Sequence, residues 1–241
     1  MSKRANTFSD AVTIRPVEVT DLIEIVALHE HCFLGEDNYS RRLGRGVLRA
    51  TYCFFLTDSK SFGYVAECDG QLVGYIVGRL DYFFDELNRY RIPAIIRAWI
   101  ERPWCLFDKR LINRGVNAIR TRLTGRVEQA SNQSAPCDGD NTTATLAYLA
   151  VKPDYTRLRI ADRFLSEAEG LCRRTGMLRL RTDINPSNVL SRFLYRRRGY
   201  EEDKSLRTTE DCIYYLYLSD TRSQAPNELS SSTHQFVSEA R

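Results

Sequence analysis

Residues 144–155 read ATLAYLAVKPDY, and residues 188–200 read NVLSRFLYRRRGY. The first stretch is an apolar run that stops at a proline, which predicts a strand over 144–151. A helix follows from near Ile160, and a helix that begins just after a strand presents unpaired backbone N–H groups and the positive end of its dipole. Such a helix start is a natural binding site for pyrophosphate. The second stretch predicts an amphipathic helix that ends at Gly199.

A β-hairpin precedes these elements. Residues 62–68 and 71–78 are two apolar-rich runs separated by Asp69-Gly70. This dipeptide favours a type I′ turn, in which both central residues need positive φ. The other predicted elements are a strand at 13–16, a helix capped by Thr20 or Asp21, a helix at 39–55, a strand at 177–184, a helix starting at Asn185-Pro186, and a strand at 211–218.

The order and spacing of these elements resemble the GNAT superfamily of N-acetyltransferases. The stretch 188–200 is similar to the family block N-x-x-A-x-x-x-Y-x-x-x-G-F, with Ser191 and Tyr200 as mild substitutions. The hairpin looks like the family's second and third strands, and 149–155 looks like its fourth strand and turn. The resemblance covers nearly all of 13–81 and 144–219. It implies an α/β (α+β) fold with a mixed, mostly antiparallel sheet, flanked by helices and splayed between strands four and five.

The resemblance also implies a co-substrate, acetyl-CoA or another acyl-CoA, in the opening between strands four and five. Backbone groups of Leu149, Ala150 and Val151 would pair with the pantetheine arm, much as a sheet accepts an added strand. Asn188 would orient the end of that arm. Tyr195 is the expected catalytic residue: a phenol with a pKa of about 10 stays protonated at neutral pH and can donate to the departing thiolate. Backbone amides of six residues would hold the pyrophosphate: Arg157, Leu158, Arg159, Ile160, Ala161 and Asp162.

This phosphate loop departs from the family pattern. The family reads Arg/Gln-x-x-Gly-x-Gly/Ala, whereas residues 156–161 read TRLRIA. Arg159 therefore stands where a glycine would let the backbone approach a phosphate closely. Two interpretations follow. Either Arg159 points aside and its guanidinium contacts a CoA phosphate, or the pocket is degraded and the protein binds CoA poorly or not at all.

The sequence does not determine the general base. Deprotonating an ammonium acceptor needs a carboxylate, a histidine or an ordered water chain near the thioester. Four carboxylates qualify, although a surface or structural role is the simpler explanation for each: Glu30, Glu67, Asp81 and Asp183. His29 and His31 are most simply explained as surface or interface residues of the first helix. The seven cysteines are scattered without a CxxC pair, so no metal site is expected.

Residues 82–143 form an insert between the third and fourth strands. Its part 89–126 holds ten basic side chains against two acidic ones, a net of +8, whereas the whole chain has a net charge of +4. Apolar residues at near-helical spacing predict a helical hairpin packed on the domain, followed by a polar connector. It would serve as a lid over the acceptor site or bind an acidic partner, such as an acyl carrier protein, a phosphorylated metabolite or a membrane surface. The helix spacing of its arginines argues against nucleic acid.

One GNAT-like domain over 13–219 is expected, between a flexible N-terminus at 1–12 and a disordered tail at 220–241. The chain has neither an apolar run of membrane-spanning length nor a secretory leader, so we expect a cytoplasmic protein. The expected activity is transfer of an acetyl or other acyl group to an amine on a small molecule or a protein, by direct attack in a ternary complex. The alternative is a catalytically silent module for CoA sensing or protein interaction. A homodimer is left open.

Overall fold

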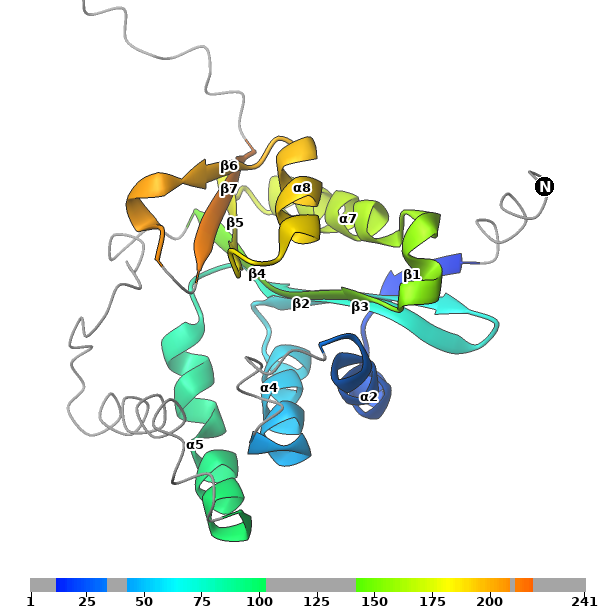
Figure 1. Ribbon diagram of the computed structural model, residues 1–241, viewed down its shortest axis with the longest axis vertical. Coiled ribbons are helices and arrows are strands. Elements are labelled where there is room, and N and C mark those ends of the chain that lie inside the picture. Colours follow the sequence, from blue (N-terminus) through cyan, green and yellow to red (C-terminus); the bar gives the residue numbers. More distant parts are fainter. Residues whose placement is uncertain (1–11, 34–42, 103–141, 209–210, 219–241) are drawn as a thin grey trace, which may run out of the picture.

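The computed structural model of the protein describes residues 12–33, 43–102, 142–208 and 211–218. Within these ranges, seven strands form one sheet in the order β1-β2-β3-β4-β5-β7-β6 (Figure 1). They are β1 (Val12–Pro16), β2 (Ser61–Cys68), β3 (Gln71–Arg79), β4 (Thr143–Val151), β5 (Arg179–Ile184), β6 (Glu201–Asp203) and β7 (Cys212–Tyr217). The β4–β5 pair is parallel and the other pairs are antiparallel. This confirms the predicted mixed, mostly antiparallel sheet; β6 was not predicted, because three residues are too few to show alternation.

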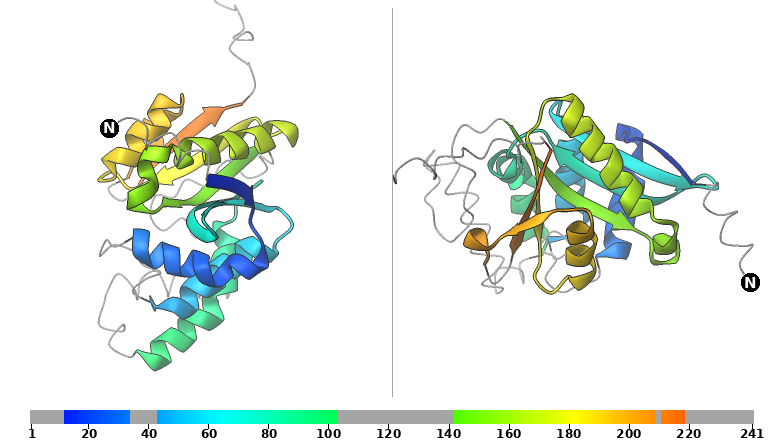
Figure 2. Two further views of the ribbon diagram at one scale, coloured as in Figure 1. Left: turned by 90° about the vertical axis from the view of Figure 1, so that its right-hand side faces the viewer. Right: turned by 90° about the horizontal axis from the view of Figure 1, so that it is seen from above.

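Helices cover both faces of the sheet. One face carries α2 (Leu22–Cys32), α4 (Arg45–Thr57) and α5 (Phe84–Glu101), and the other carries α7 (Ile160–Arg174) and α8 (Val189–Arg197) (Figure 2). Three short 3-10 turns, η1 (Val19–Asp21), η3 (Pro153–Leu158) and η4 (Lys204–Leu206), complete the described elements. Each layer buries the apolar stripe that its spacing predicts: α7 packs Phe164, Leu165 and Ala168 against the sheet, and α2 packs Ile25 and Val26.

The turns follow local backbone chemistry. Asp69 and Gly70 have φ of 52° and 74°, as a type I′ hairpin requires. The predicted start of α8 at Asn185-Pro186 was wrong by about one helical turn. Asn185 instead closes a tight turn, its Oδ1 accepting from the Ser187 N–H at 2.9 Å. Asn188 is the N-cap, and its side chain accepts from the backbone N–H three residues on.

The first arm of the predicted insert is α5. It packs on α4, where Ile95 and Ala98 join Leu43 and Val47 in a small buried cluster. The rest of the predicted hairpin lies outside the described residues, as do the predicted flexible N-terminus (apart from Val12) and C-terminal tail. No helix among the described residues is long and apolar enough to cross a membrane.

Candidate functional site

The two halves of the sheet part between β4 and β5. These strands pair over four residues each, from Thr143 opposite Arg179 to Leu146 opposite Thr182. Just beyond, the partners of β3 jump from Leu146 to Tyr148, so Ala147 is an extra residue in β4. Such a bulge bends its strand and increases the local twist. The carboxyl ends of β4 and β5 therefore diverge from an apex at Leu146 and Thr182, which is the predicted splay.

Beyond the bulge, β4 turns hydrogen-bonding groups into this opening. The Lys152 N–H donates to the Val73 carbonyl of β3 at 2.8 Å. Since alternate residues of an antiparallel strand bond to the same neighbour, Lys152 and Ala150 direct their backbone groups toward β3. Leu149 and Val151 direct theirs the other way, into the opening. Of the three β4 residues predicted to pair with pantetheine, these two have the required orientation, whereas the backbone of Ala150 faces β3.

Tyr195 reaches the apex from α8. Its side chain is buried, and its hydroxyl lies close to the side chain of Thr182, the last β5 residue paired with β4. The ring packs edge-on against Tyr200, with centroids 5.0 Å apart. Burial raises the pKa of Tyr195 to about 12, so the phenol is protonated throughout the neutral range. A phenolic donor therefore lies at the point where the two strands separate.

The predicted phosphate loop is η3 and the first turn of α7. Arg159 joins them with φ 56° and ψ 28°, the left-handed conformation that a glycine adopts most readily. Its side chain is 75% exposed and lies against Asp162, with Nε 3.6 Å from Oδ2. The backbone thus makes the turn despite the side chain, which points aside. The first backbone N–H with a helical partner is that of Arg163, bonded to the Arg159 carbonyl, so the amides of residues 160–162 remain available at the helix start.

Comparison with known proteins shows which family the sequence around this opening resembles. Residues 122–200 match the family model described as the acetyltransferase (GNAT) family. Over this third of the chain, the sequence is similar to the GNAT acetyltransferase family. No curated protein matches it by sequence.

Solved structures agree with this assignment of the fold. The PaiA N-acetyltransferase from Thermoplasma acidophilum, solved in complex with coenzyme A, is 14% identical with a TM-score of 0.53, over 86% of this chain and 98% of that one. The ribosomal-protein-S18-alanine N-acetyltransferase from Escherichia coli is 15% identical with a TM-score of 0.50, over 86% and 94%. A GNAT-family acetyltransferase from Staphylococcus aureus Mu50 is 13% identical with a TM-score of 0.53, over 87% and 100%. At these identities, the likeness shows the fold.

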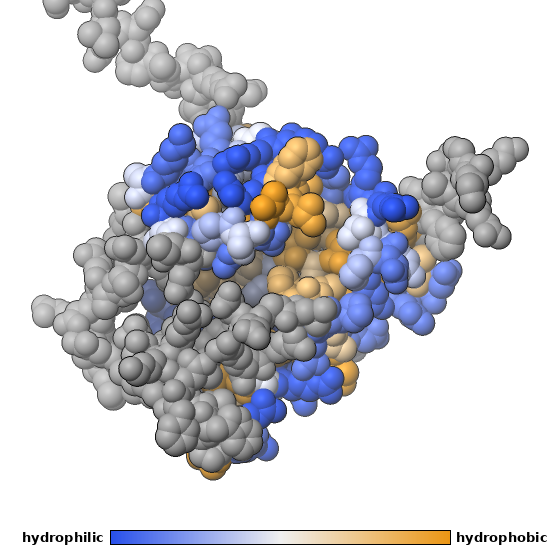
Figure 3. Space-filling model, in the orientation of Figure 1, coloured by the Kyte–Doolittle hydropathy of each residue, from blue (hydrophilic) through white to orange (hydrophobic). Residues whose placement is uncertain are grey.

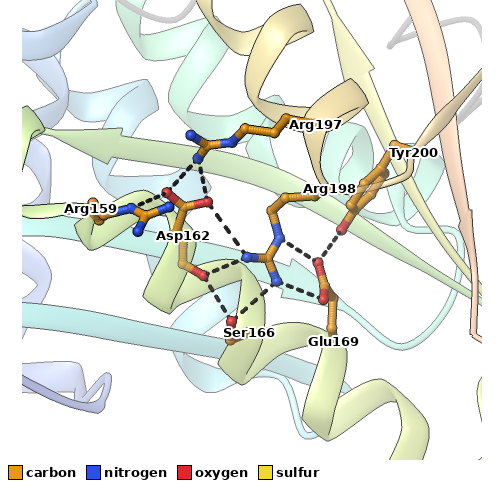
Figure 4. A network of polar contacts seen from close by, with 7 residues as sticks. All are labelled: Arg159, Asp162, Ser166, Glu169, Arg197, Arg198 and Tyr200. Carbon is orange, nitrogen blue, oxygen red and sulfur yellow. Dashed lines mark hydrogen bonds and ion pairs between the residues drawn. The ribbon is translucent and has the colours of Figure 1, made fainter.

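A polar network ties the α7 helix start to the end of α8 (Figure 4). Asp162 accepts two hydrogen bonds from Arg197 Nη2, at 2.6 and 2.7 Å, and Arg198 Nη1 lies 3.6 Å from it. Arg198 also donates to both carboxylate oxygens of Glu169, at 3.0 and 2.8 Å. The Asp162 carboxylate complements the positive end of the helix dipole and holds arginines beside it. Two of those arginines, Arg159 and Arg197, are exposed.

The remaining residue predicted to contact the cofactor, Asn188, has a structural role. Its Oδ1 accepts from the Ser191 N–H at 3.1 Å and caps α8. Exposed apolar side chains follow it on the same helix: Val189, Leu190 and Phe193. They form the apolar patch over α8 in Figure 3. The predicted contact of Asn188 with pantetheine stays a prediction.

All four candidate general bases are ion-paired. Glu30 lies 2.7 Å from Arg45, Glu67 lies 3.2 Å from Arg15, and Asp81 lies 2.8 Å from Lys60. Asp183 accepts from Arg181 at 2.8 and 2.9 Å. Of the four, Asp183 is the one next to the opening, because it follows the last β5 residue that pairs with β4.

The expectation that His29 is a surface residue was wrong; His31 is exposed as expected. The His29 side chain is 1% exposed, and its Nδ1 lies 2.5 Å from the Tyr52 hydroxyl and 3.0 Å from the Tyr75 hydroxyl. Tyr148, which follows the β4 bulge, packs edge-on against the His29 ring with centroids 5.5 Å apart. Helical spacing with Ile25 and Val26 was the signal that could have placed His29 in the core.

Proposed function

We propose that this GNAT domain transfers an acyl group, in the simplest case acetyl, from acyl-CoA to an amine by direct attack in a ternary complex. The observation that carries the proposal is a coincidence in space. The β4 bulge, the outward backbone groups of Leu149 and Val151 and the hydroxyl of Tyr195 all belong to the apex of one opening. Packing of a hydrophobic core alone does not require these three features to occur together.

Acyl-CoA would bind across the α7 face of this opening. The backbone of Leu149 and Val151 would pair with the amides of pantetheine, and the apolar patch on α8 would border its uncharged arm. The free amides of residues 160–162 would hold the pyrophosphate, with the backbone of residues 157–159 leading into them. Arg159 and Arg197 stand exposed beside this helix start, so each guanidinium can turn from Asp162 to a phosphate oxygen.

The chain's own groups then define the chemistry. As the amine attacks the thioester carbonyl, its oxygen gains negative charge, and a β4 N–H that faces the opening can donate to it. Tyr195 donates a hydrogen bond to the departing sulfur. With a phenol pKa of about 12, complete proton transfer to an ordinary thiolate is uphill, because a thiol's pKa is about 8.5. Tyr195 therefore acts mainly as a fixed donor that stabilises the leaving thiolate. Asp183 is the carboxylate best placed to take the proton that the acceptor's ammonium loses before attack. The second proton, which the nitrogen loses as the C–S bond breaks, goes to the departing thiolate.

The first experiment is acetyl-CoA binding measured by thermal shift. A ligand at about 100 times its dissociation constant adds about 2.7 kcal/mol to the stability of the folded state. The absence of any shift at millimolar acetyl-CoA would contradict the proposal. With binding established, release of CoA is assayed with a panel of amines. Tyr195→Phe should then lower kcat at least tenfold while leaving the shift with acetyl-CoA unchanged, and unaltered turnover would remove Tyr195 from the reaction.

One observation favours the silent alternative. Asp162 already places a carboxylate at the α7 helix start and engages Arg197 there. If this internal pair excludes phosphate, the fold would serve interaction rather than catalysis. Asp162→Asn separates the two cases: it weakens the arginine contacts and keeps the side-chain size. An acetyl-CoA shift that appears in the variant and is absent in the wild type would support a closed, silent site.

A further inference from the structure

Arg181 is a buried arginine beside the apex of the opening. It lies on β5 opposite Thr145, one residue before the last that pairs with β4. Its side chain is 1% exposed. Since strand side chains alternate, Arg181 and Asp183 project to the face opposite Thr182 and Tyr195. On that face the Arg181 guanidinium lies over the Tyr82 ring, 5.9 Å from its centroid.

One edge of this guanidinium is fully used. Nε and Nη2 donate to the two oxygens of Asp183, at 2.8 and 2.9 Å. The third nitrogen, Nη1, is buried and has no hydrogen-bond partner among the described residues. Buried polar groups in folded proteins nearly always have a partner, and an unmet donor on a charged group is especially costly. Nη1 is therefore an unsatisfied hydrogen-bond donor, with which an acceptor oxygen of a ligand could pair.

The charges on this face of the sheet limit the class of molecule that can supply the acceptor oxygen. Arg181 and Asp183 neutralise each other, so a simple anion at Nη1 would give the site a net negative charge. A simple ammonium at Asp183 would leave Nη1 unmet. A molecule that carries both groups satisfies both ends of the pair without adding net charge. The neighbouring aromatic groups, Tyr82 and Tyr215, offer ring faces and hydroxyls to its uncharged part.

We propose that the acceptor of this GNAT domain is an amine that also carries a carboxylate, with the ammonium at Asp183 and a carboxylate oxygen on Arg181 Nη1. This rests on the proposed acyl transfer and specifies its acceptor. The site lies next to the apex that Tyr195 approaches from the other face. Amine and thioester would therefore meet across the opening, with the carboxylate fixing the direction of approach.

The test uses the full chain and matched amines. Glycine, β-alanine and 4-aminobutyrate vary the spacing between the two charges, each is paired with its carboxamide, and propylamine lacks the oxygen altogether. Acetyl-CoA binding is measured by thermal shift, acetylation by CoA release, and amine binding by calorimetry in the presence of CoA. At least one carboxylate should exceed its carboxamide by roughly 10- to 100-fold in kcat/KM or affinity, the range of a charge-assisted hydrogen bond.

Arg181→Lys should abolish that preference, because an ammonium can hold Asp183 but has no third nitrogen to offer. Arg179→Lys is the matched control: it lies on the same strand and face, its guanidinium stacks on Tyr215, and the preference should survive. Equal binding and turnover of carboxylates and carboxamides by the wild type would overturn the proposal, whether or not Arg181→Lys folds. So would a preference that persists in Arg181→Lys. Failure of acetyl-CoA to bind, with Arg181-dependent binding of an amino acid intact, would refute the proposed acyl transfer and leave this site standing.

Discussion

The left-handed residue at the start of α7 offers a test in which stability and CoA binding move in opposite directions. Arg159 has φ 56°, a conformation that costs a residue with a Cβ about 1–2 kcal/mol relative to its preferred geometry. Its ion pair with Asp162 is long, at 3.6 Å, and exposed, so it contributes between zero and about 1 kcal/mol. Arg159→Gly removes both effects, whereas Arg159→Ala removes the guanidinium and keeps the strain.

The glycine variant should therefore be more stable than the alanine variant by about 1 kcal/mol. For a chain of this size that corresponds to roughly 2–4 °C in Tm. Both variants should bind CoA less tightly by a similar factor, roughly fivefold for one exposed guanidinium on a phosphate. Thermal melts with and without CoA measure both quantities. A glycine variant no more stable than the alanine variant would refute the strained backbone, and unchanged CoA affinity in both would refute the phosphate contact.

Three further outcomes follow from packing and charge. Gly78→Ala should destabilise the fold by about 1–3 kcal/mol in urea denaturation, because its Cβ would lie 2.6 Å from a Phe62 ring carbon and 2.7 Å from a β4 carbonyl oxygen. Tyr52→Phe should lower Tm by several degrees, because the Tyr52 hydroxyl is hydrogen-bonded in the core to His29 Nδ1 and to the Tyr75 hydroxyl. The Arg15 guanidinium lowers the pKa of Asp21. The Arg15–Asp21 ion pair therefore stabilises the folded state at neutral pH, and this stabilisation is lost as pH falls below about 4. Asp21→Asn should flatten the loss of stability between pH 5 and about 3, measured by urea titration at each pH.

The sequence was most informative where local chemistry decides the structure. The Asp69-Gly70 hairpin, the α7 start at Ile160 and the end of α8 at Gly199 were predictable, because each depends on φ or on apolar spacing within a few residues. The motif at 188–200 placed Tyr195 correctly on α8. These signals were enough to predict the fold and its opening.

Features that depend on partners far along the chain could not be predicted. The Ala147 bulge exists only relative to β3, and the pairing of Asp162 with Arg197 spans 35 residues. Each of the four candidate bases turned out to be paired with an arginine or a lysine, which spacing alone does not show. The sequence predicted that the insert packs on the domain, but it could not show that Ile95 and Ala98 of α5 pack against Leu43 and Val47.

The short contact between β4 and β5 has a mechanical consequence. The four paired residues on each of β4 and β5 join two parts of the sheet, one formed by β1 to β4 and the other by β5 to β7. Beside this short pairing, one buried cluster that includes Ile76 of β3, Leu180 of β5 and Tyr214 of β7 joins the two parts. A ligand that forms hydrogen bonds with β4 and also contacts α8 would connect these two parts of the sheet. Its binding free energy would then add to the free energy needed to separate the two parts of the sheet.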